Sequence, residues 1–206
     1  MKIMLLAWTL LAWIPAAFAA GSATNFTTNS ITARGAWSDI TNGLRGRLEI
    51  VADPNKFNSG QNRFAQVFLE IENPSTTNQA LEIPFRLTPP ISAKIIGADG
   101  GPLPNVTGGR GSEQYGRQPW VIQPGSSEKF DLNRRGSSFS SSKPGLLIAL
   151  RGGDTPFSNC WVVPYDASED YFLSAVLSVP ASTNAPANNW FGEMKLPPVK
   201  IPRLAN

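Results

Sequence analysis

The chain of 206 residues contains no histidine and only one cysteine, Cys160. The lack of histidine excludes Ser-His-Asp and Cys-His catalysis and removes the commonest protein ligand of zinc and copper. A single cysteine excludes an internal disulfide, a thiolate metal cluster and dithiol redox chemistry. A folded domain of this chain must therefore be stabilised by its core and not by cross-links.

Charge is also sparse. Charged residues make up 16% of the sequence, and the basic ones are scattered except for the pair Arg134-Arg135. A nucleic-acid-binding protein normally presents a cluster of basic side chains on one face, so we expect no nucleic-acid partner. The acidic residues include no two that stand out as the facing carboxylate pair of a glycosidase. We therefore expect no enzyme activity and no cofactor.

The first residues have the three parts of a secretory signal peptide. Lys2 supplies a positive charge, residues 3–14 are apolar but too few to span a bilayer, and Ala17-Phe18-Ala19 fits the cleavage rule. We predict a signal peptide over residues 1–19 and a mature chain that is secreted or periplasmic. An uncleaved anchor is the alternative, which Pro15 disfavours because it breaks the helix. No later segment is long and apolar enough to cross a membrane.

Segments with a two-residue hydrophobic period follow from residue 44 onwards. Val67, Leu69 and Ile71, for example, alternate with polar residues, which places apolar and polar side chains on opposite faces of a strand. We predict nine strands, over residues 44–51, 64–72, 81–87, 93–98, 119–122, 128–132, 145–150, 171–179 and 192–201. Residues 20–38 are predicted to be a flexible lead-in or an irregular first strand, and residues 39–206 a single domain.

Glycine and proline mark the turns between these segments. The polar loop that begins at Asn73-Pro74 lies between two alternating segments and indicates a hairpin. Pro197-Pro198 interrupts the last segment, which is typical of an edge strand or a bulge. Short strands, frequent turns and no helical period favour an all-β fold with a two-layer β-sandwich, and a closed barrel is the alternative.

Four motifs resemble those of bacterial exported immunoglobulin-like β-sandwich domains. In residues 68–83 a strand ends in Asn, a polar turn follows and an apolar strand returns. Residues 122–127 look like the L-x-P-G-E-S turn of such domains, and residues 143–147 are similar to their K-P-G-x-Y strand entry, with Leu147 in place of the usual aromatic. Trp190-Phe191-Gly192 resembles the W-x-G that opens their last strand. The resemblance implies an immunoglobulin-like sandwich of eight or nine antiparallel strands, and such a fold does not by itself fix a function.

Two groups of residues are candidates for ligand binding. The acidic loop 166–170 could supply oxygen ligands to Ca²⁺ from Asp166, Glu169 and Asp170, although it lacks the glycine and the alternation of an EF-hand loop. A solvated turn is the alternative. Exposed aromatic rings can stack on sugars, and the candidates for this role are Trp120, Trp190 and Tyr115. For the two tryptophans the alternative is packing in the core.

Cys160 lies in the apolar run 157–163, so we interpret it as an inert core thiol, with a reactive or intermolecular thiol as the alternative. Taken together, the sequence favours an exported, non-catalytic β-sandwich module. Its role would be structural or protein-binding, in the cell envelope or outside the cell, with a protein or a surface polymer as partner. The alternative is a carbohydrate-binding domain that uses exposed aromatic side chains.

Overall fold

A computed structural model of the chain describes residues 30–57, 62–76, 79–84, 90–106, 119–134, 144–151 and 159–204. These residues form eleven β-strands and no helix, which confirms the all-β prediction. The strands are β1 (Ile31–Arg34), β2 (Arg45–Phe57), β3 (Arg63–Glu72), β4 (Leu81–Ile83), β5 (Ile91–Gly97), β6 (Trp120–Ile122), β7 (Ser127–Asp131), β8 (Gly145–Ala149), β9 (Cys160–Pro164), β10 (Tyr171–Val179) and β11 (Gly192–Lys200). The predicted signal peptide, residues 1–19, lies outside the described residues.

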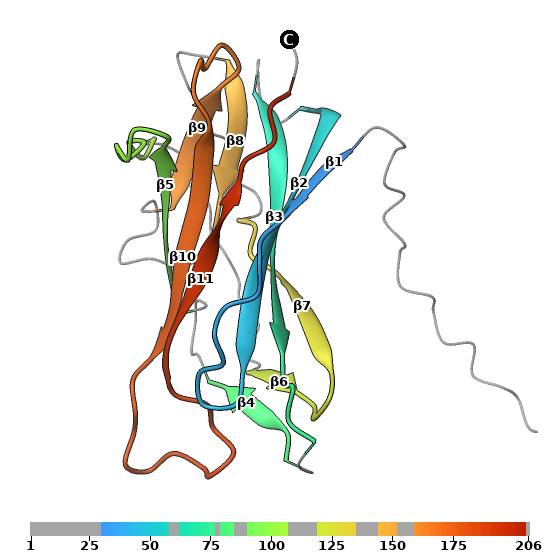
Figure 1. Cartoon of the computed structure of the whole chain (residues 1–206), viewed down its shortest axis with the longest axis vertical. Coiled ribbons are helices and arrows are strands. Elements are labelled where there is room, and N and C mark those ends of the chain that lie inside the picture. The colour runs from blue at the N-terminus through green and yellow to red at the C-terminus, as the bar shows by residue number, and fades with distance from the viewer. Residues whose placement is uncertain are drawn as a thin grey trace, which may run out of the picture.

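The strands form three sheets (Figure 1). The largest has six strands in the order β1-β2-β3-β8-β9, with β7 also paired to β3; β11-β10-β5 form a second sheet, and β4-β6 a third. All these pairs are antiparallel except β3 with β8, which is parallel. The prediction of eight or nine antiparallel strands is therefore wrong in both number and direction. The added strands are β1 and β9.

β7 and β8 share one edge of β3 because an asparagine fills the gap between them. β7 pairs with the second half of β3, and β8 pairs with its first two residues. At Val67, between the two, the buried Asn133 accepts a hydrogen bond from the backbone N–H (2.7 Å) and donates one to the backbone oxygen (3.2 Å). Its amide thus replaces a strand residue, so no backbone group of Val67 is left unpaired.

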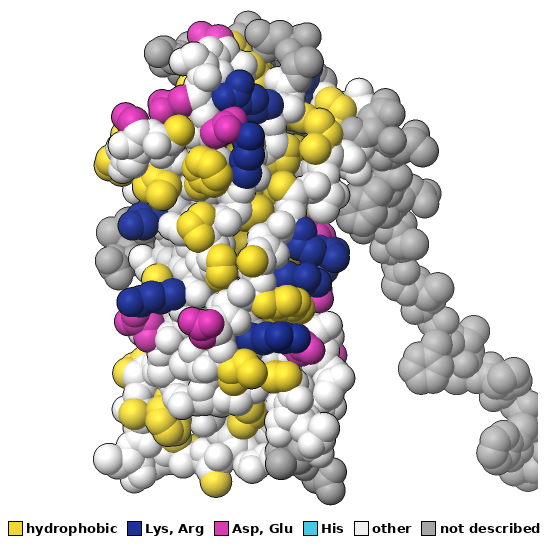
Figure 2. All heavy atoms as spheres, in the orientation of Figure 1, with side chains coloured by type: hydrophobic (Ala, Val, Ile, Leu, Met, Phe, Trp, Pro, Cys, Tyr) yellow, Lys and Arg dark blue, Asp and Glu magenta, His cyan; other side chains and the backbone are white. Residues whose placement is uncertain are grey.

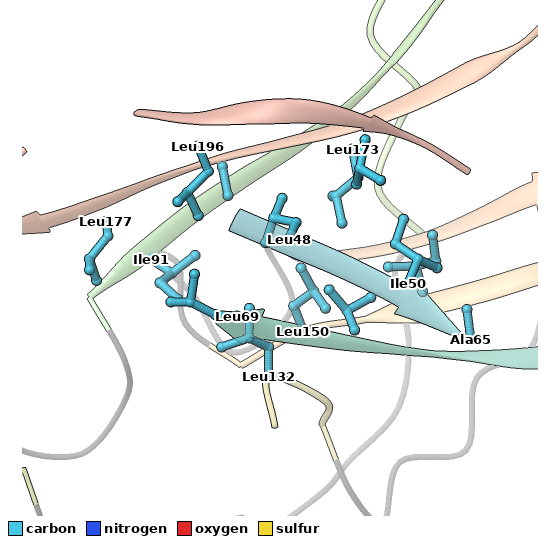
Figure 3. Close-up of a cluster of buried hydrophobic side chains, with 14 of the residues drawn as sticks. Leu48, Ile50, Ala65, Leu69, Ile91, Leu132, Leu150, Leu173, Leu177 and Leu196 are labelled. Carbon is cyan, nitrogen blue, oxygen red and sulfur yellow. The ribbon is translucent and has the colours of Figure 1, made fainter. Parts of the chain in front are cut away.

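The two larger sheets contribute to one hydrophobic core. Alternate residues of β2 and β3 face inward, so that Leu48 lies beside Leu69 and Ile50 beside Val67 in the strand register. Side chains from β10 and β11 meet them from the other sheet (Figure 3). The contact is close at Gly46 on β2, where a Cβ atom would come within 2.9 Å of the side chains of Met194 and Leu196. A larger residue at this position would force the ends of these two side chains to shift.

β8 and β9 are buried on both faces, so neither shows a two-residue period; the sequence predicted β8, whose start resembles a known strand-entry motif, and missed β9. Leu147, Ala149, Cys160 and Val162 form a second small cluster on the face of the sheet that points away from the main core. A strand buried on both faces reads as a continuous apolar run without alternation. Val106, which follows β5, donates its backbone N–H to the oxygen of Cys160 (2.8 Å).

The predicted hairpin between β3 and β4 is wrong, because β4 pairs with β6. Both edges of β3 are already occupied at its end, where Glu72 pairs with Arg45 of β2 and with Ser127 of β7. Asn73 instead holds the turn before β7: it donates its N–H to Ser126 (3.0 Å) and accepts that of Gly125 (2.8 Å). Two of the motifs noted in the sequence therefore contact each other.

The two ends of the described chain are both strands at sheet edges. β1 is the described part of the segment for which we predicted a lead-in or an irregular first strand, and it pairs regularly with β2 from Ile31 to Arg34. β11 is an edge strand of its sheet, and its register with β10 shifts across Pro197-Pro198. The prediction of an edge strand or a bulge at these prolines is confirmed, and both features are present.

Candidate functional site

A hollow lies at one end of the molecule, beside the segment 180–191 that joins β10 to β11, here called the β10–β11 loop. It has a volume of about 480 Å³, within the range of roughly 300–1,000 Å³ that small-molecule sites occupy. Its lining consists of Pro84, Val179, Pro180, Ser182, Asn184, Ala185, Pro186, Asn189, Trp190 and Phe191. None of these side chains carries a charge. This loop lies at the bottom of Figure 1, and the described side chains at this end are also uncharged on the face shown in Figure 2.

Trp190 fixes the floor of this hollow. The residue is 1% exposed, and its indole Nε1 donates a hydrogen bond to the backbone oxygen of Thr41 (2.8 Å). Its backbone N–H donates to the oxygen of Glu82 on β4 (2.7 Å), and the N–H of Glu82 donates to the oxygen of Asn188 (2.9 Å). The end of the β10–β11 loop is therefore held by a buried ring and by strand-like hydrogen bonds.

Phe191, the next residue, is 47% exposed and lines the hollow. Its backbone oxygen accepts a hydrogen bond from the side-chain amide of Asn42 (2.6 Å). Gly192 follows with φ +134°, and a Cβ atom there would lie 2.9 Å from Nδ2 of the same Asn42. Only glycine adopts this backbone conformation without strain, so Phe191 is presented to solvent on a fixed backbone.

Asn189 adds a polar group to the lining. Its Oδ1 atom is buried and has no hydrogen-bond partner among the described residues. An unsatisfied buried amide oxygen costs about 1–3 kcal/mol, which a donor that reached this amide would recover. Ser182 and Asn184 supply further hydroxyl and amide groups on the same loop. The hollow thus combines an exposed ring with neutral hydrogen-bonding groups.

The structure places two of the three aromatic residues that were predicted to stack on a ligand. Trp190 is buried and offers no open ring face, so its proposed role passes to Phe191 beside it. Trp120 is half-buried on β6 and stacks on Phe130 of β7, with ring centroids 4.2 Å apart. Tyr115 lies outside the described residues. The motif around Trp190 located the hollow, but a phenylalanine next to a tryptophan gave no signal of which ring is exposed.

The acidic loop does not bring its carboxylates together. Asp170 forms ion pairs with Lys200 (2.7 Å) and Arg203 (2.9 Å), and its hydrogen bond with Lys200 lowers its pKa. Glu169 instead accepts a hydrogen bond from the hydroxyl of Tyr171 (3.1 Å). Among the described residues, no group of three or more acidic or cysteine side chains could hold a metal ion.

A second surface feature is a set of ion pairs on the outer face of β1, β2, β3 and β7, here called the ion-pair ladder. Its members are Arg34, Arg45, Arg47, Glu49, Glu70, Glu72 and Lys129. Glu49 is 4% exposed and binds both Arg34 (2.6 Å) and Lys129 (2.8 Å). Burial raises the pKa of Glu49, but the hydrogen bonds from Lys129 and Arg34 outweigh this effect and keep the pKa below its usual value.

The rest of the ion-pair ladder is paired in the same way. Arg47 donates a hydrogen bond to Glu70 (2.8 Å) and thereby lowers the pKa of that carboxylate. Arg45 binds Glu72 (2.6 Å), and the guanidinium groups of Arg45 and Arg47 lie 5.0 and 4.2 Å from the centre of the Trp37 ring. The four cations of the ion-pair ladder share three carboxylates, so that each of these described cations has an acidic partner.

Cys160 is 1% exposed, and burial raises the pKa of its thiol to about 12. At neutral pH the thiolate needed for nucleophilic attack is therefore scarce, which agrees with a core thiol.

No protein-family model matches the chain, and no curated protein or solved structure shows significant similarity to it. In the described ranges of the chain, no helix has the length and hydrophobicity to cross a membrane.

Proposed function

We propose that this protein is an exported, non-catalytic binding module, built on a two-layer immunoglobulin-like β-sandwich, that holds its partner at the hollow beside the β10–β11 loop. The shared core between the two larger sheets supports the sandwich. The signal-peptide pattern supports export to the periplasm or to the outside of the cell. The partner is a protein or a polymer of the cell envelope.

The observation that carries the proposal is the fixed exposure of Phe191. An exposed apolar side chain on a mobile loop would need no explanation. Here the backbone on both sides is held, by Asn42 at the Phe191 oxygen and by Glu82 at the N–H of Trp190. Because the backbone that carries the ring is already ordered, little backbone entropy is lost when a partner covers the ring, which favours binding.

The proposal is tested by co-sedimentation of the exported protein with insoluble cell envelopes of its own organism. The wild-type protein should sediment with the envelopes, and Phe191→Ala should remain largely in the supernatant. Ile31→Ala is the matched control, because Ile31 is similarly exposed (44%) but lies on β1, away from the β10–β11 loop (Figure 1). Equal sedimentation of the two variants, or no sedimentation of the wild type, would contradict the proposal.

Export is tested separately by sequencing the N-terminus of the protein recovered outside the cytoplasm. We expect the mature chain to begin at Ala20, because Ala17-Phe18-Ala19 fits the cleavage rule. Exported protein that still begins at Met1 would show that the leader is retained.

A further inference from the structure

We infer that the ligand of the hollow is a neutral saccharide, an inference that rests on the proposed binding function of this site. The first argument is charge. All ten lining residues are uncharged, and among the described side chains the ion-pair ladder lies on a different part of the molecule, on β1, β2, β3 and β7. A charged ligand would lose hydration in this hollow without meeting an opposite charge among the described lining residues, which is unfavourable.

The second argument is the combination of groups in the lining. A sugar unit presents an apolar C–H face bordered by hydroxyl groups that donate and accept hydrogen bonds. Phe191 offers a ring for the apolar face, and Asn184 and Asn189 offer amides for the hydroxyl groups. The buried Oδ1 atom of Asn189 has no partner among the described residues, and a ligand hydroxyl that reached it would supply one.

The third argument sets saccharides apart from peptides. A peptide that binds as an added strand needs free backbone groups, but those of the β10–β11 loop at residues 188 and 190 are already bonded to Glu82. A proline-rich peptide needs a groove lined by several aromatic rings. Of the lining residues, only Phe191 presents an exposed ring, because Trp190 is 1% exposed. Recognition at this hollow is therefore left to side-chain amides and one ring.

The test uses the envelope-binding assay with two treatments. In one arm the envelopes are digested exhaustively with protease before the protein is added. In the other, soluble oligosaccharides released from the same envelopes by mild acid are separated by anion exchange into neutral and acidic pools, and each pool is added as a competitor. We expect binding to survive the protease and to be inhibited by the neutral pool only.

Two variants connect these results to the hollow. Phe191→Ala should weaken binding about tenfold, as expected for the loss of one aromatic contact with its buried area. Asn184→Ala should weaken it by a smaller factor, and because Asn184 is exposed this change leaves the fold intact. Ile31→Ala should bind as the wild type does.

Loss of binding after protease treatment, or inhibition by the acidic pool, would overturn the saccharide inference. If either of these results occurred while Phe191→Ala still failed to bind untreated envelopes, the proposed binding function would stand with another class of partner. Binding that is equally strong for Phe191→Ala and the wild type would overturn both.

Discussion

The buried carboxylate of Glu49 allows a sharp test of the energetics of the outer sheet face. It is 4% exposed and has two cationic partners, Arg34 and Lys129, whose side chains are 49% and 41% exposed. If the ion pairs are broken, the two cationic side chains can therefore rotate into solvent and be hydrated, whereas the carboxylate of Glu49 cannot. We expect the two variants that remove the cations, Arg34→Ala and Lys129→Ala, to be strongly coupled.

Each single variant leaves Glu49 with one partner and loses an ion pair that is largely screened by water. The expected decrease in the free energy of unfolding is about 0.5–1 kcal/mol for each single variant. The double variant leaves a buried carboxylate without its partners, which costs about 3–5 kcal/mol. The difference between the double variant and the sum of the singles is then about 2 kcal/mol, within the roughly 0.5–3 kcal/mol range of measured couplings.

The assay is urea unfolding of the protein, followed by tryptophan fluorescence. Adding Glu49→Gln to the double variant should restore most of the lost stability, because the neutral amide has no buried charge. Without its cations the pKa of Glu49 is raised by burial, so the double variant should also gain stability relative to wild type as the pH falls towards 4. Lys195→Ala, which removes a cation that is 82% exposed, serves as the control and should change little.

Additive losses from the two single variants would refute this reasoning. So would a triple variant with Glu49→Gln that is no more stable than the double variant. Either result would mean that water reaches the carboxylate in place of its cations.

Three further outcomes are expected. A thiol reagent should label Cys160 slowly in the native protein and rapidly in denaturant, because its thiol is buried and its pKa is about 12; fast native labelling would show that it is exposed. The free energy of unfolding should be nearly constant between about pH 6 and 8, where only histidine normally titrates. The free energy of unfolding should decrease as the pH drops below about 4.5, the ordinary carboxylate pKa, because the folded pKa of Glu49 and of Glu70 is lowered. It should also decrease as the pH rises above 9, because the folded pKa of the Cys160 thiol is raised. A melting temperature that moves by more than a few degrees between pH 6 and 8 would contradict the expected constancy, and one that drops with chelator would indicate a bound metal ion. Gly192→Ala should destabilise the protein by about 1–3 kcal/mol, because its φ of +134° strains any other residue, and an unchanged urea midpoint would show that the backbone there adjusts freely.

The two-residue period predicts the strands that alternate; of the two strands buried on both faces, β8 was predicted, with a strand-entry motif at residues 143–147, and β9 was missed. β3 and β10 show a clear two-residue period, because one face of each contacts the core and the other is less buried. In β9 both faces are covered, so Cys160-Trp161-Val162-Val163 is uniformly apolar and was interpreted only as a buried run. Periodicity reports the contrast between two faces, and a strand without that contrast gives no signal.

Pairing was harder to predict than the strands themselves. The turn at Asn73 looked like a hairpin because local turn chemistry does not show that both edges of β3 are occupied by strands from elsewhere in the chain. The same limit applies to the hollow. Its exposed ring, Phe191, is distinguished from the buried Trp190 only by contacts with Thr41 and Asn42, about 150 residues away in sequence. Non-local contacts of this kind decide exposure.

The positions of charged and neutral side chains also bear on why the hollow suits a binding role. On the outer sheet face, each cation of the ion-pair ladder has a carboxylate partner on another strand. The residues that line the hollow beside the β10–β11 loop are all neutral. In the proposed binding role, these residues would contact a ligand through shape, ring stacking and neutral hydrogen bonds. Such contacts depend little on pH or salt, so we expect the affinity of the hollow to change little with either.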